Sequence, residues 1–379
     1  MAVQIPRWTG RAVIVAMLGV VTVWVLLGWL HANALRAEFM VPLESSGPFD
    51  LTVVANEAGR VTVDRTDATV REGIWGLEGT EAYGRLGPIV RVTDETVERG
   101  ITPQVGDLVP GTPARIDVDA YTGDPLTALG IGFEPLRSPS EIGPQPAWFI
   151  DGRRGTWVIF VHGRGTDRLT ESLRITPSLV EQGFPVMAIT IRNDDGATPS
   201  ESGLRYWGIE EWHDVDAAIE AGLRKGAQDF VLIGSGFGSE IVSMFLHESQ
   251  HVDLVKGVVF DSPVLDLEDV AVRYAEAHGT PGIVAWLGRR LTALRFGLDW
   301  SLLDQVARSA EFDVPILLLH GAQDPVTPVE TFEAFADARP DIVRRHRFEQ
   351  ATHTDLWNVD SARYERTVAD FMLEIAGPE

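Results

Sequence analysis

The most informative residues of this sequence form a short glycine-rich stretch. Residues 234–238 read Gly-Ser-Gly-Phe-Gly and follow the apolar run 230–233. The pattern has the form of a nucleophile elbow, Gly-x-Ser-x-Gly, in which a strained turn between a strand and a helix exposes a serine hydroxyl. Here Gly236 stands where that serine would be. Glycine adopts the strained turn easily, but it removes the atom that would attack an ester or amide.

A second pattern, His247-Glu-Ser-Gln-His251, matches the H-E-x-x-H motif. In that motif two histidines one helical turn apart bind zinc, and the glutamate acts as the base. Its context is unfavourable because it comes at the far end of the helix expected after the elbow, away from the strand ends where α/β sheets bind ligands. Zinc-protease chemistry through His247, Glu248 and His251 is therefore a minor alternative, and we predict no metal or cofactor.

From residue 147 onward, apolar strand patterns alternate with amphipathic helix patterns. We expect strands at 157–161, 185–191, 229–233, 255–260, 315–319 and 345–348, and helices at 170–182, 210–225, from 237 onward and 361–375. This order predicts an α/β fold, a mostly parallel sheet with helices on both faces. The proline-rich stretch 135–146 before it is typical of a connecting loop.

Several short motifs follow these predicted elements in a fixed order. They are His162-Gly-Arg-Gly, Arg192-Asn-Asp, Glu211-Trp, the elbow, Asp261-Ser-Pro, His320-Gly-x-x-Asp324 and His353-Thr-x-x-Trp357-Asn-Val-Asp360. Together they resemble the α/β-hydrolase superfamily, specifically the exported or membrane-anchored hydrolases of GC-rich bacteria. The resemblance covers residues 147–379 and implies an α/β-hydrolase fold with a helical cap formed by the insertion 264–311.

The resemblance also implies a catalytic triad in the chain order nucleophile, acid, base. It would consist of position 236, Asp324 and His353. In this chemistry the imidazole removes a proton from the nucleophile, and the carboxylate orients the imidazole and stabilises its charged form. Asp261 is an alternative acid. The backbone N–H groups of Arg164 and Phe237 would form the oxyanion hole, which does not depend on the side chain at 236.

Two other serines could replace the missing nucleophile. Ser235 precedes the elbow position, but a shift of one residue along a strand turns the side chain to the opposite face. Its hydroxyl should therefore point away from His353. Ser239 lies in the helix that follows and is a weaker substitute.

The N-terminal region carries a membrane signal. Residues 12–30 contain no charge, and as a helix they rise about 28 Å, close to the roughly 30 Å hydrocarbon core of a bilayer. Trp24 and Trp29 fit an interfacial aromatic belt. We expect a retained anchor; a cleaved signal peptide ending at the Ala-x-Ala pattern 32–34 is the alternative.

The charges that flank this segment predict its orientation. Arg7 and Arg11 precede it, whereas Arg36 follows it together with Glu38, Glu44 and Asp50. The positive-inside rule then makes residues 1–11 cytoplasmic and the body of the protein extracytoplasmic or, with a cleaved signal, secreted. The next stretch, 39–134, shows period-two alternation separated by turn residues and predicts a small β-rich module.

Composition excludes several function classes. The 379-residue chain has 45% hydrophobic residues, a formal net charge of −23 and no cysteine. The charge argues against a nucleic-acid partner, because phosphate binding needs a basic surface. The lack of cysteine excludes disulfides, thiolate nucleophiles and cysteine-ligated zinc.

Two function classes remain. The first is a membrane-anchored hydrolase of esters or amides, acting on a small-molecule, lipid or peptide acyl substrate with an impaired or unusual nucleophile. The second is a non-catalytic pseudoenzyme that binds a ligand or partner in the former active-site cleft. Whether the protein is catalytically active depends on residue 236.

Overall fold

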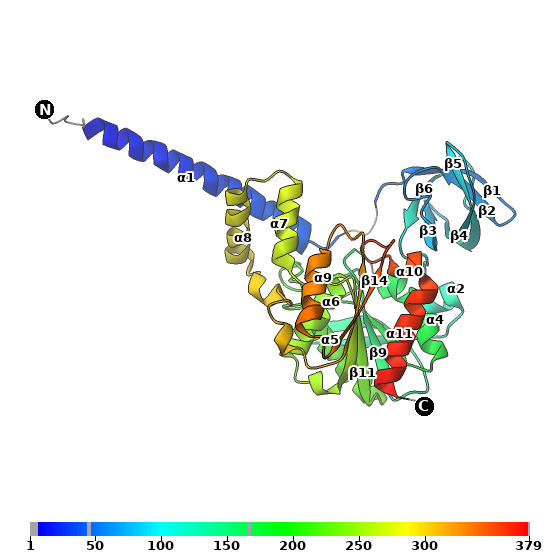
Figure 1. Cartoon of the computed structure of the whole chain (residues 1–379). Helices are drawn as coiled ribbons and strands as arrows, with labels where there is room; N and C mark the ends of the chain where they lie inside the picture. Colours follow the sequence, from blue (N-terminus) through cyan, green and yellow to red (C-terminus); the bar gives the residue numbers. More distant parts are fainter. Residues whose placement is uncertain (1–6, 44–46, 166–167, 378–379) are drawn as a thin grey trace. The chain divides into compact units, whose positions relative to one another are not determined.

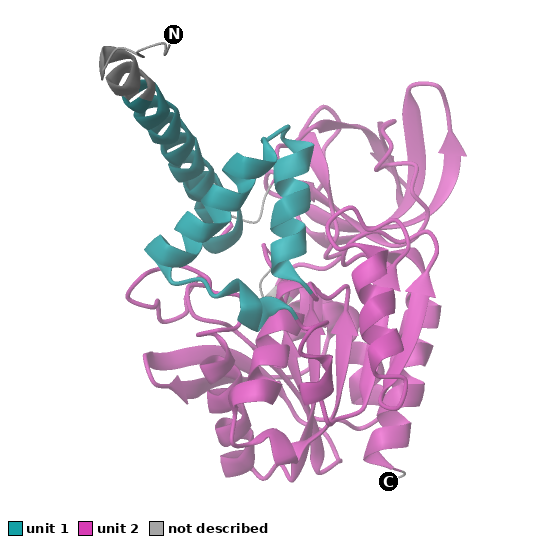
Figure 2. Ribbon diagram, turned by 60° about the vertical axis from the view of Figure 1, so that its left-hand side comes forward, with its two compact units in different colours: residues 1–41, 266–304 teal, residues 42–265, 305–379 magenta. Residues whose placement is uncertain are grey.

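The computed structural model describes residues 7–43, 47–165 and 168–377. It divides into two compact units (Figure 2). One comprises residues 1–41 and 266–304; the other comprises residues 42–265 and 305–379. The larger unit contains a sheet with helices and a β-barrel, and the smaller one is helical.

The centre of the larger unit is an eight-stranded sheet with the order β14-β13-β12-β11-β9-β10-β8-β7. The strands from β14 to β10 in this order run parallel, whereas β8 pairs antiparallel with β10 and with β7. Their bounds are β7 Glu134–Ser140, β8 Gly143–Ile150, β9 Thr156–Val161, β10 Val186–Ile189, β11 Asp229–Ser235, β12 Val255–Asp261, β13 Ile316–Gly321 and β14 Val343–Phe348. All residues of β9 and β13 are buried, as a continuous apolar run in a parallel sheet requires.

Helices cover both faces of this sheet (Figure 1). Helices α5, α6 and α9 lie on one side, and α4 and α11 lie on the other. The helical segments of this unit are α2 Pro125–Leu129, α3 Arg168–Glu171, η2 Ser172–Arg174, α4 Thr176–Glu181, α5 Trp212–Lys225, α6 Phe237–Glu248, η3 Val252–Leu254, η5 Ser309–Glu311, α9 Val329–Ala338, α10 Leu356–Val359 and α11 Ser361–Ala376. The predicted order of strands and helices is therefore confirmed.

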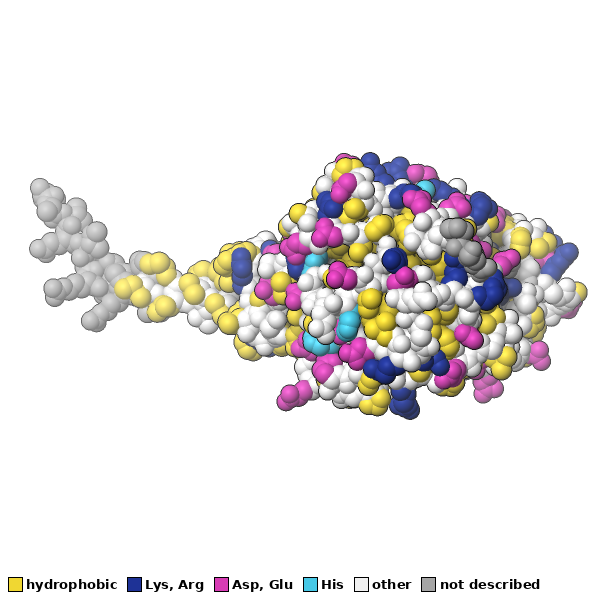
Figure 3. All heavy atoms as spheres, turned by 90° about the horizontal axis from the view of Figure 1, so that it is seen from below, with side chains coloured by type: hydrophobic (Ala, Val, Ile, Leu, Met, Phe, Trp, Pro, Cys, Tyr) yellow, Lys and Arg dark blue, Asp and Glu magenta, His cyan; other side chains and the backbone are white. Residues whose placement is uncertain are grey.

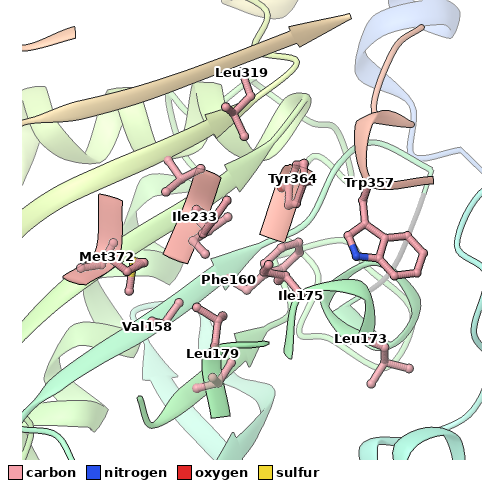
Figure 4. Packing of buried hydrophobic residues seen from close by; sticks show 14 of the residues in the cluster. Val158, Phe160, Leu173, Ile175, Leu179, Ile233, Leu319, Trp357, Tyr364 and Met372 are labelled. Carbon is pink, nitrogen blue, oxygen red and sulfur yellow. The ribbon is translucent and has the colours of Figure 1, made fainter. Parts of the chain in front are cut away.

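The core between the sheet and α4 and α11 is apolar (Figure 4). Val158 and Phe160 from β9 and Ile233 from β11 meet Leu179 from α4 and Met372 from α11. These residues alternate along their strands, so one face of each strand supplies this layer. The layer fixes the sheet whose strand ends carry the candidate site.

Two local predictions were wrong. The stretch 135–146 is not a loop but most of the hairpin formed by β7 and β8. Pro135 and Pro139 lie in β7, the edge strand, where proline is tolerated. Pro144 and Pro146 lie in β8 before the residues that pair with β10. The helix predicted at 170–182 is broken into α3, η2 and α4, with Pro177 in the first turn of α4.

A closed six-stranded antiparallel barrel precedes the sheet, in the order β1-β2-β5-β4-β3-β6. Its strands are β1 Leu51–Glu57, β2 Arg60–Asp64, β3 Trp75–Gly79, β4 Tyr83–Val92, β5 Thr96–Val105 and β6 Pro113–Asp117. Inward residues such as Val53, Val63 and Leu77 form a separate apolar core. Pairing of β1 with β6 closes the barrel and leaves no free edge.

An arginine is completely buried in this barrel. The Arg99 guanidinium donates hydrogen bonds to the main-chain carbonyls of Gly87, Thr69, Arg71 and Gly73. Burial lowers the pKa of Arg99 to about 10. Four carbonyl dipoles thus satisfy a buried cation and tie residues 69–73 to the barrel.

The smaller unit is built from α1 Arg7–Leu35, the π-helical turn η1 Arg36–Met40, α7 Leu267–Ala277, α8 Gly282–Phe296 and the short η4 Trp300–Leu303. Helix α8 packs against both α1 and α7. Residues 16–40 are long and apolar enough to cross a membrane by length and composition. Exposed hydrophobic side chains line the described part of α1 (Figure 3).

Candidate functional site

The elbow lies at the junction of β11 and α6. Strand β11 ends at Ser235, α6 begins at Phe237, and Gly236 between them has φ +46° and ψ −110°. This backbone conformation is one that non-glycine residues rarely adopt and that active sites retain. The predicted turn between strand and helix is therefore formed.

The two outer glycines of the motif are required by close packing. A Cβ atom at Gly234 would lie 2.7 Å from the backbone of Ser239, and one at Gly238 would lie 2.1 Å from the carbonyl oxygen of Val161. These distances are too short for any side chain. Gly238 thereby lets the start of α6 approach the end of β9.

The central glycine is different. A Cβ atom at Gly236 would lie 3.3 Å from Nε2 of His353 and 3.4 Å from Cγ2 of Thr354. Small adjustments of these side chains would accommodate it. A side chain at 236 would therefore project directly toward the His353 imidazole.

His353 is held on its other side by a carboxylate. Its Nδ1 lies 2.8 Å from Oδ2 of Asp324. Asp324 also accepts hydrogen bonds from the backbone N–H groups of Val326 and Thr327 and from the Thr327 hydroxyl. Burial disfavours ionisation of Asp324, but the hydrogen bonds from His353 and Thr327 outweigh it and hold the pKa of this carboxyl below its usual range. Asp324 is thus a fixed anion that orients His353.

Strand topology explains why position 236, Asp324 and His353 meet. They follow β11, β13 and β14, which are parallel to one another within the sheet. The carboxyl ends of parallel strands share one edge, where α/β proteins bind ligands. The structure brings together these residues, which are far apart in the sequence.

Ser235 is not placed against His353. Its side chain is buried, and its hydroxyl donates to Oε1 of Glu171 at 2.5 Å. The hydroxyl of Ser239 donates to the carbonyl of Gly234 inside the elbow. Neither serine presents its oxygen to the imidazole at the elbow.

The segment that contains Arg164 lies beside the elbow. It follows β9, and the backbone N–H of Gly163 donates to Oε2 of Glu171 at 2.6 Å. Glu171 therefore joins this segment to Ser235 through its two carboxylate oxygens. Phe237 is the first residue of α6, so its N–H belongs to the first turn, whose donors have no partner within the helix.

A buried charged network anchors the start of the segment that follows β9. Nε2 of His162 lies 2.7 Å from Asp194, which also pairs with Arg205 at 2.7 Å. Burial disfavours the charged imidazole, but the adjacent Asp194 outweighs it and raises the pKa of His162. The Arg205 guanidinium in turn lies 5.0 Å from the centre of the Phe237 ring.

A second buried network lies behind the elbow and was not predicted. Arg174 pairs with Glu171 at 2.7 Å and donates to the side chain of Asn358 and the carbonyl of Thr354, the residue after His353. Burial raises the pKa of nearby Asp261 to about 6 despite the opposing effect of Arg174. The spacing of Glu171 and Arg174 by three residues was the one local signal of this network.

The barrel contributes to the same network. Burial raises the pKa of Asp119, at the end of the barrel module, to about 8, and the charge of Asp117 adds to the shift. Asp261 lies among these groups: its carboxylate bonds to Ser262 and Tyr364, and its carbonyl accepts the N–H of Gly236. Its carboxylate thus belongs to the buried network, whereas Asp324 contacts His353.

The H-E-x-x-H stretch does not form the arrangement that a zinc site needs. Helix α6 ends at Glu248, and His251 follows outside it. His247 bonds to Gln305, whereas His251 bonds to Asp216. Within the described ranges, no group of three or more His, Asp or Glu side chains is placed to hold a metal ion.

Comparison with solved structures places this geometry in a known fold. An esterase from Pyrococcus furiosus is similar to 68% of this chain over 96% of its own length, with 18% identity and a TM-score of 0.55. A puromycin-hydrolyzing peptidase from Mycobacterium tuberculosis is similar over 90% of this chain and 57% of its own length, with 17% identity and a TM-score of 0.54. The chain therefore has the α/β-hydrolase fold.

Sequence comparison is less informative. Residues 52–117 match the model of a domain family of unknown function, DUF8805. These residues coincide with the barrel. No curated protein matches the sequence.

Proposed function

We propose that this protein is a membrane-anchored acyl hydrolase of the α/β-hydrolase superfamily that lacks the covalent nucleophile. The observation that carries the proposal is the intact pair of His353 and Asp324, 2.8 Å apart, facing the place where a side chain at 236 would stand. Its substrates are esters or amides of small molecules, lipids or peptides. Loss of the nucleophile from a comparable triad costs about 10⁶ in turnover, so its activity is low.

His353 would act as a general base on water. Nε2 removes a proton from a water molecule as the water oxygen bonds to the carbonyl carbon, and the protonated imidazole then returns the proton to the departing alkoxide or amine. Asp324 stays ionised and stabilises the imidazolium. The N–H groups of Arg164 and Phe237 would stabilise the negative oxygen of the intermediate.

The apolar helix α1 supports a location at the cell membrane. Residues 12–30 would span the bilayer, with residues 1–11 in the cytoplasm and the hydrolase domain outside it. A cleaved signal peptide would instead release the protein. Intact mass of the protein recovered from the membrane and from the extracellular fraction distinguishes the two, because cleavage after Ala34 removes all of α1 except Leu35.

The second candidate is a pseudoenzyme that binds a ligand in the same cleft. The contacts of Ser235 and Ser239 favour it, because their hydroxyls bind Glu171 and the carbonyl of Gly234 and neither faces His353. In that case His353 and Asp324 contribute to ligand binding. The two candidates differ in whether His353 supports turnover.

A gain-of-function substitution tests the proposal. Purified protein is compared with Gly236→Ser and Gly236→Ala, using a fluorophosphonate probe and a short-chain p-nitrophenyl ester. We expect Gly236→Ser to gain labelling and a turnover increase of orders of magnitude, because its hydroxyl lies within reach of His353. Gly236→Ala adds the same Cβ atom without the hydroxyl and should gain neither.

The wild-type protein decides between the candidates. Slow turnover without labelling, lost in His353→Ala, supports the water mechanism. No turnover in the wild type, with both gains in Gly236→Ser, supports the pseudoenzyme. Labelling of wild-type Ser235 would overturn both assignments of the site.

A further inference from the structure

Helix α8 in the smaller unit exposes an apolar stripe. Ile283, Trp286 and Leu294 have exposed fractions of 48%, 46% and 81%. Scattered exposed hydrophobic residues are ordinary, but contiguous ones mark a binding surface. Spacings of three and eight residues place these three on one face of a helix.

Helix α8 is packed tightly against the outer end of the apolar segment in α1. A Cβ atom at Gly28 would lie 2.7 Å from Cβ of Leu287, and one at Gly288 would lie 2.4 Å from the ring of His31. The two glycines thus allow a close helix contact, as small residues do between helices in membranes. The contact falls at residues 28–31, where the charge-free segment ends.

The stripe continues the surface of α1. Leu287 and Leu291 lie beside Gly28. Ile283 precedes Leu287 by one turn, and Leu294 follows Leu291 by about one turn, so all four share a face of α8. Trp29 and Leu30 of α1, next to Gly28, are also exposed and apolar, so both helices carry exposed apolar side chains near their contact.

The charges of α8 are those of a membrane interface. Although the chain has a net charge of −23, α8 contains Arg289, Arg290 and Arg295 and no acidic residue. Arg289 pairs with Glu268 of α7 at 2.9 Å, so Arg290 and Arg295 supply the positive charge at this surface. The Arg290 guanidinium lies 5.9 Å from the Trp286 ring, and that of Arg295 lies 3.4 Å from the Trp29 ring. Tryptophan and arginine with apolar neighbours are typical of segments at the headgroup level.

We propose that α8 lies in the headgroup region of the bilayer that α1 spans. Ile283, Trp286 and Leu294 contact the ends of the acyl chains, and Arg290 contacts lipid phosphate. Helix α8 thereby acts as a second, interfacial contact beside the anchor. This inference rests on the proposed membrane anchor, and its test separates the two.

The absence of cysteine from the chain makes a site-specific test direct. Single variants Ile283→Cys and Leu294→Cys of the full chain are labelled with an environment-sensitive fluorophore. They are placed in nanodiscs of phosphatidylcholine and phosphatidylglycerol, with and without brominated acyl chains. Leu18→Cys in α1 is the membrane control, and Val54→Cys on the barrel, whose side chain is 47% exposed, is the solvent control.

We expect brominated lipid to quench the labels at 18, 283 and 294 and to leave the label at 54 unchanged. If only position 18 is quenched, α1 spans the bilayer and the inference for α8 is wrong. If position 18 is not quenched, the anchor itself fails and the inference fails with it. A blue-shifted label at 283 or 294 without quenching would mean that protein covers the stripe, which also overturns the inference.

A charge reversal tests the phosphate contact. In the protein labelled at 294, Arg290→Glu should reduce quenching more in discs with phosphatidylglycerol than in discs of phosphatidylcholine alone. Arg273→Glu, an exposed position on α7 of the same unit, is the matched control and should have little effect. Equal effects of the two reversals would remove Arg290 from the lipid contact.

Discussion

The three glycines around the elbow have different physical reasons to be glycine. At 234 and 238 a Cβ atom would overlap with backbone atoms, whereas at 236 it would meet only side chains at 3.3 Å and beyond. Packing therefore demands glycine at the outer positions. At the centre only the positive φ favours it.

The close packing predicts that alanine is poorly tolerated at position 238. Gly238→Ala should destabilise the protein by about 1–3 kcal/mol or more, because its Cβ would overlap with the carbonyl of Val161. Gly132→Ala is the control, since nothing lies within 4 Å of the added atom. Thermal unfolding in detergent measures both; an equal melting temperature for the two variants would contradict the packing argument.

At the scale of residues, the sequence predicted which residues form the candidate site, but not the buried polar network around them. His353, Asp324 and the elbow follow strands whose apolar runs are visible in the sequence. Glu171 and Arg174 escaped notice because they fall within an apparently regular helical pattern. Their roles depend on Ser235 and Asn358, which are distant in the sequence.

Among the elements, the connection between the barrel and α10 includes a buried side-chain amide with three hydrogen bonds. Nδ2 of Asn358 donates to the carbonyls of Ile74 and Val118, and its Oδ1 accepts from Arg174. Arg71 adds an ion pair to Asp355 at 2.6 Å. The end of the barrel module and the segment after His353 are thus held through polar contacts.

We predict that Asn358→Ala destabilises the protein strongly. It leaves two carbonyls and a guanidinium short of partners, at about 1–3 kcal/mol for each buried group left unpaired. Arg60→Ala removes an exposed ion pair with Glu98 and should cost about 0–1 kcal/mol. Calorimetry compares the two, and similar costs would show that the amide does not hold the barrel.

The element order could be predicted because buried parallel strands and amphipathic helices have distinct periodicities. The hairpin of β7 and β8 could not, because prolines that usually mark loops are tolerated in the edge strand β7 and in the part of β8 that does not pair with β10. Closure of the barrel could not be predicted from the sequence either. It depends on pairing between β1 and β6, which are separated by the whole module and share no local signal.

For the whole molecule, buried carboxylates predict a dependence of stability on pH. The pKa of Asp119 is raised to about 8 and that of Asp261 to about 6, mainly by burial. Between the usual pKa of about 4 and these raised values, the folded state holds a proton that the unfolded state has lost. The free energy of unfolding therefore decreases as pH rises through this range. Burial lowers the pKa of His320, which acts in the opposite sense.

A variant isolates the contribution of Asp119. Asp119→Asn mimics the protonated side chain, so its stability relative to the wild type should increase between pH 5 and 8.5, by at most about 1.4 kcal/mol per pH unit. Asp107→Asn, at an exposed position, is the control. Melting temperatures across this range measure the difference, and a constant offset for Asp119→Asn would contradict the prediction.

The contacts of Arg99 in the barrel affect which residues of this module can vary among related proteins. It binds the loop 69–73 only through main-chain carbonyls. Every residue type carries a carbonyl, so the contact with Arg99 does not depend on the side chains of that loop. Other contacts do constrain them, because a Cβ atom at Gly73 would overlap with the carbonyl of Asn358 and Arg71 pairs with Asp355. Relatives of this barrel should therefore preserve the arginine and the course of the loop, and differ at its exposed positions such as Glu72.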